Sequence, residues 1–106
     1  MASPEPPIAS IVLCSLTVAL EGVEEGAVEA GLSADSARPI ARQALLGSTL
    51  LLQDLSESPA ALKDRVASPG GTTIAGLAAL EDRGARGALI RAVEQSVLRA
   101  VEGRDK

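Results

Sequence analysis

Apolar residues recur at helical spacing along most of this chain, and no segment alternates between apolar and polar positions as a strand does. The spacing predicts a long helix from Ile8 to Ala30, apolar at first and amphipathic later, with Gly31 as its C-terminal cap. Four residues continue one apolar face and four glutamates line the other: Ile11, Cys14, Val18 and Val23, against Glu21, Glu24, Glu25 and Glu29.

A second helix is expected to follow Ser33, whose hydroxyl can cap it, and to run to about Leu55. Asp35 is favourable in the first turn because of the helix dipole. Pro39 lies past the tolerated first turn, so we expect either a kink or a delayed start there. The core candidates of this helix are Ile40, Ala44, Leu45, Leu51, Leu52 and Leu55.

Three shorter helical segments follow. Ser58 and Pro59 set the cap and first position of a helix over Pro59–Val66, and periodic apolar positions predict helices over Thr73–Arg83 and Ala85–Val101. Gly84 separates the last two. Their core candidates are Ile74, Leu77, Leu80, Leu89, Val93 and Val97. The prediction is an all-α fold of about five helices over residues 8–102, preceded by a flexible Pro-rich tail over residues 1–7.

Residues 68–73, which read Ser-Pro-Gly-Gly-Thr-Thr, form the most distinctive local pattern. The proline biases the serine away from helical geometry, and the two glycines can take positive φ and let a ligand approach bare N–H groups. Thr72 or Thr73 is expected to cap a helix whose first amides favour an anion. No lysine follows the glycines, so the segment is not a phosphate-binding Walker loop. Spacing alone leaves two interpretations open: a helix cap after a tight turn, or a carboxylate site.

Composition narrows the chemistry. The 106 residues are 46% hydrophobic, yet none is aromatic, so small side chains must supply the core and association through a shared core is favoured. The absence of histidine excludes His-based triads and most zinc sites, and we expect no metal. The single cysteine, Cys14, is expected to be a buried, inert thiol. The carboxylates at Glu24-Glu25, Asp64 and Glu81-Asp82 are expected to be solvated rather than catalytic.

Charge and segment lengths bear on partners and location. The net charge is −4 and the basic residues are scattered, so nucleic-acid binding is not expected. The apolar run Ile8–Leu20 is shorter than the roughly 20 residues of a membrane-spanning helix. Residues 1–7 carry an acidic residue and no basic one, unlike a signal peptide. We therefore expect a cytoplasmic protein without membrane contact.

The stretch from Ser58 to Ala100 resembles the C-terminal domain of pyrroline-5-carboxylate reductase, which reduces pyrroline-5-carboxylate to proline with NAD(P)H in proline biosynthesis. The similarity covers about Glu21 to Arg99. The residues that carry it are Val28–Leu32, Gln43–Gly47, Pro59, Leu62, Lys63, Asp64, Val66, Ser68–Leu77, Leu80, Glu81, Gly84, Ala92 and Val93.

The resemblance implies a fold, a site and a partner. The fold would be an interlocked helical dimer of the 6-phosphogluconate-dehydrogenase-type C-terminal domain, as a homodimer or higher oligomer. In the family, this loop holds the substrate carboxylate by a serine hydroxyl and by amides at the helix start. Carried over, Ser68 and the amides of Thr72 and Thr73 would bind a proline-like carboxylate, with Gly70 and Gly71 in the same loop. The Thr73 hydroxyl would approach the ring nitrogen as the catalytic residue. The hydride would come from NADPH or NADH, so no side chain needs to act as a nucleophile.

Two of the family's features differ here. We find no Gly-x-Gly-x-x-Gly turn after a strand, and the first helix opens with residues 7–12, Pro-Ile-Ala-Ser-Ile-Val, instead of the family's Ser-Gly-x-Gly-Pro-Ala. We therefore expect a truncated or stand-alone dimerisation and substrate-binding domain that binds no cofactor and catalyses nothing alone. A variant of this hypothesis is that a separate nucleotide-binding chain completes the enzyme. The alternative is a non-catalytic helical oligomerisation module.

Overall fold

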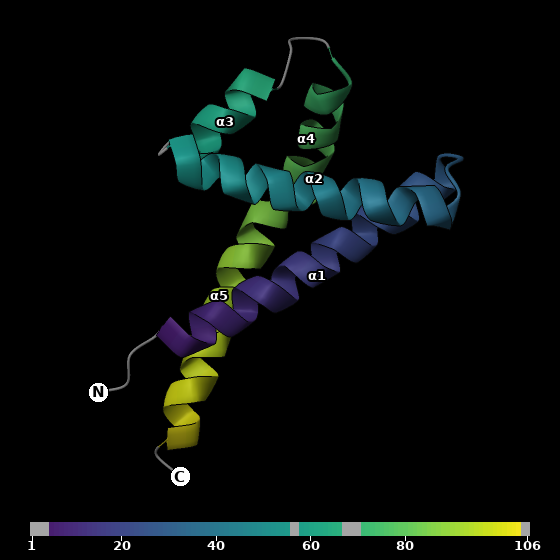
Figure 1. The fold of residues 1–106 in the computed structure, drawn as a ribbon. Helices are drawn as coiled ribbons and strands as arrows, with labels where there is room; N and C mark the ends of the chain where they lie inside the picture. The colour runs from purple at the N-terminus through teal and green to yellow at the C-terminus, as the bar shows by residue number, and fades with distance from the viewer. Residues whose placement is uncertain (1–4, 56–57, 67–70, 105–106) are drawn as a thin grey trace. The chain divides into compact units, whose positions relative to one another are not determined.

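The computed structural model describes residues 5–55, 58–66 and 71–104, and every regular element in these ranges is an α-helix (Figure 1). The helices are α1 (Glu5–Glu29), α2 (Ala34–Leu55), α3 (Pro59–Val66), α4 (Thr72–Asp82) and α5 (Ala85–Arg104). The predicted all-α fold of about five helices is confirmed.

Helix α1 begins at Glu5, three residues before the predicted start at Ile8. Pro6 and Pro7 therefore lie in its first turn, where the missing proline N–H groups would have no intrahelical acceptor anyway. The predicted tail over residues 1–7 overlaps α1 at Glu5–Pro7, and residues 1–4 lie outside the described ranges.

The end of α1 is the C-cap that the sequence predicts. Gly31 has a φ of 117°, which disfavours any residue with a Cβ. The N–H of Gly31 donates to the carbonyl of Val28 at 3.0 Å, and the N–H of Leu32 donates to the carbonyl of Ala27 at 3.0 Å. This pair of bonds is a Schellman motif, and it satisfies two carbonyl groups that the helix end would leave without partners.

Helix α2 has the predicted N-terminal cap. The hydroxyl oxygen of Ser33 accepts a hydrogen bond from the N–H of Ser36 at 3.2 Å, and the Ser33 carbonyl accepts from Ala37 at 2.9 Å. The helix begins at Ala34 and includes Pro39, so the delayed start is wrong. Because the cap already secures the first turn, the proline removes only one intrahelical bond, that to the carbonyl of Asp35. The kink stays a prediction.

A serine begins α3, and a glycine separates α4 from α5. Ser58 caps α3, because its hydroxyl oxygen accepts from the N–H of Ala61 at 3.1 Å. Gly84, with a φ of 74°, ends α4 by donating to the carbonyl of Glu81 at 3.1 Å and starts α5 by accepting from Ala88 at 2.9 Å. One left-handed glycine therefore serves both helices, and the predicted stop at Gly84 is confirmed.

The chain divides into two compact units, residues 20–79 and residues 1–19 with 80–106. In the unit of residues 20–79, Ala37 of α2 is 2% exposed, and among the described residues it is the one fully buried hydrophobic residue. In the other unit, Ile11 of α1 and Val93 and Val97 of α5 are half-buried. Among the residues whose burial is described, neither unit has an extensive core.

Most predicted core positions are exposed in the single chain, which corrects that part of the prediction. Val18 is 70% exposed and Val23 is 60% exposed. Ile40, Ala44, Leu51, Ile74, Leu80 and Leu89 are exposed as well, and Cys14 is exposed rather than buried. Helical spacing identifies an apolar face but not what covers it. Ile11, Leu45, Leu52, Leu77, Val93 and Val97 are half-buried.

Candidate functional site

The N-terminus of α4 is the described part of the predicted carboxylate site. The carbonyl of Gly71 accepts a hydrogen bond from the N–H of Ala75 at 3.4 Å, so Gly71 occupies the N-cap position. Thr72 and Thr73 are the first two residues inside the helix. The prediction that Thr72 or Thr73 caps α4 is therefore wrong, because glycine is itself tolerated at an N-cap and the helix starts directly after it.

The start of α4 still favours a negatively charged ligand. The amides of Thr72 and Thr73 belong to the first turn, whose N–H groups have no intrahelical acceptor, and the helix dipole favours negative charge there. Both threonines are exposed and Gly71 is half-buried, so an anion can reach the helix start. Of the five residues predicted to bind substrate, Gly71, Thr72 and Thr73 lie together. Ser68 and Gly70 lie outside the described residues.

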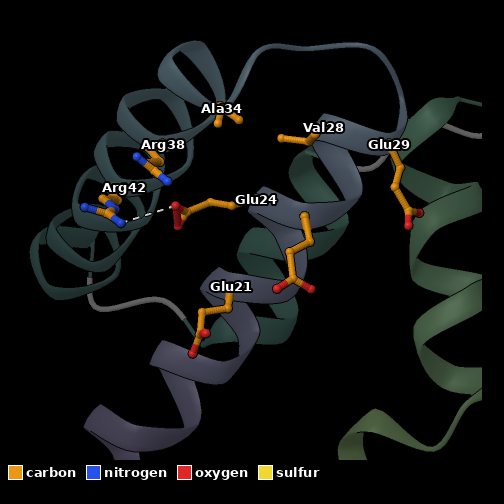
Figure 2. A pocket seen from close by; sticks show the side chains of 9 residues that line it. Glu21, Glu24, Val28, Glu29, Ala34, Arg38 and Arg42 are labelled. Carbon is orange, nitrogen blue, oxygen red and sulfur yellow. Dashed lines mark hydrogen bonds and ion pairs between the residues drawn. The ribbon is translucent and has the colours of Figure 1, made fainter.

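A cavity of about 550 Å³ lies between α1 and α2 within the unit of residues 20–79 (Figure 2). Glutamates of α1 line one side, and Arg38 and Arg42 of α2 line the other. An oxygen of the Glu24 carboxylate accepts from Nη2 of Arg42 at 3.3 Å. The Glu24 side chain is 13% exposed, whereas that of Arg42 is 61% exposed.

The cavity corrects the expectation that Glu24 belongs to a solvated face. Glu24 turns toward α2 and is paired there, while Glu25, Asp64, Glu81 and Asp82 are exposed as expected. Helical spacing on α1 alone could not reveal this contact, because the cation comes from a different helix. Within the described ranges, no group of three or more Cys, Asp or Glu residues is placed to hold a metal ion. The cavity thus presents an ion pair that joins α1 to α2.

A second ion pair spans the junction of α4 and α5. Both Nε and Nη2 of Arg86 donate to one carboxylate oxygen of Glu81, at 3.3 and 2.8 Å. The hydrogen bond to the Glu81 carboxylate, together with its charge, raises the pKa of Arg86 above the ordinary value. Both side chains are exposed, so the contact adds little stability and mainly orients the two helix ends around Gly84.

Helix α1 is unusually apolar for a helix with no buried residue. It is 25 residues long and holds a window with a mean hydropathy of 1.6, none of which is buried in the single chain. By length and composition it could cross a membrane, so the length argument against such a segment is wrong. A helix that is covered by another protein surface can have the same length and apolar composition. The cytoplasmic location stays a prediction.

A helical domain that exposes this many large apolar side chains is of the class that associates with another surface. The sequence supports the same class. Residues 9–103 match the protein family described as pyrroline-5-carboxylate reductase dimerisation. The chain belongs to this family, and the predicted resemblance is confirmed.

Similar curated proteins are pyrroline-5-carboxylate reductases from distant organisms. The reductase of a Synechocystis species is 46% identical over 83 residues, which are 78% of this chain and 31% of that protein. Pyrroline-5-carboxylate reductase 3 of Danio rerio is 49% identical over 82 residues, 77% of this chain and 28% of that protein. Pyrroline-5-carboxylate reductase 2 of Homo sapiens is 45% identical over 85 residues, 80% of this chain and 27% of that protein. The chain therefore spans about a third of the length of the curated relatives it matches.

The fold also matches part of a solved reductase. The crystal structure of pyrroline carboxylate reductase from Plasmodium falciparum with NADP bound superposes with a TM-score of 0.82. The match covers 93% of this chain and 41% of that chain, at 24% sequence identity. At this identity, the likeness shows only that the matched part of that chain has the same fold.

Proposed function

We propose that this chain is the dimerising and substrate-binding part of a pyrroline-5-carboxylate reductase. Two copies associate through their exposed helix faces, and residues 68–73 bind the carboxylate of pyrroline-5-carboxylate or proline. The observation that carries the proposal is the family match over residues 9–103, because it includes both the apolar helices and the Ser-Pro-Gly-Gly-Thr-Thr sequence of residues 68–73.

The free energy of covering the exposed apolar side chains favours association over a lone monomer. Eighteen large apolar side chains in the described residues are 39% exposed or more. Covering the exposed part of each contributes about 1 kcal/mol, so a partner that covers most of them contributes on the order of 15 kcal/mol. Bringing two chains together costs about 4–15 kcal/mol. A second copy with the same apolar faces can therefore supply the core that one chain lacks.

In the proposed site, the start of α4 holds the anion. The amides of Thr72 and Thr73 donate to the carboxylate, and the hydroxyl of Ser68 adds a charge-assisted hydrogen bond. The hydroxyl of Thr73 approaches the ring nitrogen and orients the imine. The position of Gly71 at the N-cap supports this assignment, because a residue without a side chain leaves the approach to both amides open.

A nicotinamide cofactor supplies the hydride in the proposed reaction. The Plasmodium falciparum reductase, whose structure contains NADP, supports this part of the proposal. The sequence holds no Gly-x-Gly-x-x-Gly turn, so we assign no residue of this chain to the cofactor. Where that part of the site comes from a separate nucleotide-binding chain, the present chain contributes only dimerisation and carboxylate binding.

The proposal is tested by titrating the chain with proline while following backbone amide shifts. We expect saturable shifts at residues 68–73 and no oxidation of NADPH or NADH when the chain alone is given pyrroline-5-carboxylate. Steady cofactor oxidation would refute the view that this chain needs a nucleotide-binding partner. Dimerisation without any response at residues 68–73 would instead identify a helical oligomerisation module that does not bind the ligand.

A further inference from the structure

We draw no further inference here: the strongest candidate, the charged cavity between α1 and α2, carries nothing because its carboxylates form an acidic cluster along one helix, its mostly buried Glu24 is already paired with Arg42, and no second feature of the described residues points to a ligand there.

Discussion

At the scale of single residues, Thr73 has two roles in this account, as a first-turn residue of α4 and as a proposed ring contact. Thr73→Val keeps the shape and removes the hydroxyl. It should leave the fold intact and weaken proline binding several-fold, because one neutral hydrogen bond is worth about 0.5–1.5 kcal/mol. Ser68→Ala should weaken binding more, because a bond to an ionised carboxylate is worth about 1.5–3 kcal/mol. Calorimetric titration measures both affinities, and parent-like affinity in both variants would mean that residues 68–73 do not bind the ligand.

Substitution of Arg42 tests the ion pair between α1 and α2. Arg42→Ala removes the ion-pair partner of the mostly buried Glu24 carboxylate and should cost about 1–3 kcal/mol of unfolding free energy. Arg91→Ala is the matched control. It removes the exposed pair with Glu94 on α5 and should cost less than about 0.5 kcal/mol. Urea unfolding gives both values, and equal costs would mean that the Glu24 contact is no stronger than a surface pair.

At the scale of the elements, Gly84 determines how α4 passes into α5. Gly84→Ala should cost about 1–2 kcal/mol, because the residue has a φ of 74° even though a Cβ would meet no described atom within 4 Å. Gly87→Ala provides the comparison, since Gly87 lies inside α5 with equally open space and should gain up to about 1 kcal/mol. Stabilisation by both changes would refute the role of the left-handed turn.

Helix ends were the part of the fold that the sequence predicted best, because their signals are local. Two serines cap helices at their predicted positions, and two glycines with positive φ end helices at theirs: Ser33 and Ser58, and Gly31 and Gly84. The start of α4 was predicted one residue late, since either glycine or threonine can serve as an N-cap and only the backbone bond from Ala75 to Gly71 distinguishes them.

Contacts between helices could not be predicted in the same way. The pairing of Glu24 with Arg42 depends on how α1 lies against α2, which neither helix encodes alone. The exposure of Val18 and Val23 could not be predicted either. Periodicity shows that a helix face is apolar, but it does not identify the surface that covers it. The carboxylate site was predicted from a resemblance in residues 68–73, and only its α4 portion is among the described residues.

At the scale of the whole molecule, folding and association should be linked. If the second copy completes the core, the melting temperature should rise with protein concentration, because the dimer is the state that association stabilises. Circular dichroism melts over a hundredfold concentration range provide the measurement. A melting temperature that does not change with concentration would indicate a monomer that is stable alone or a dimer that unfolds without dissociating.

The central claim is that one chain is an incomplete folding unit and two chains make a complete one. Its most direct test is the molar mass of the folded protein in solution, measured by sedimentation equilibrium at micromolar concentration. We predict a mass of twice the 10.7 kDa of one chain, or a higher even multiple. A helical, cooperatively folded species with the mass of one chain would contradict the account.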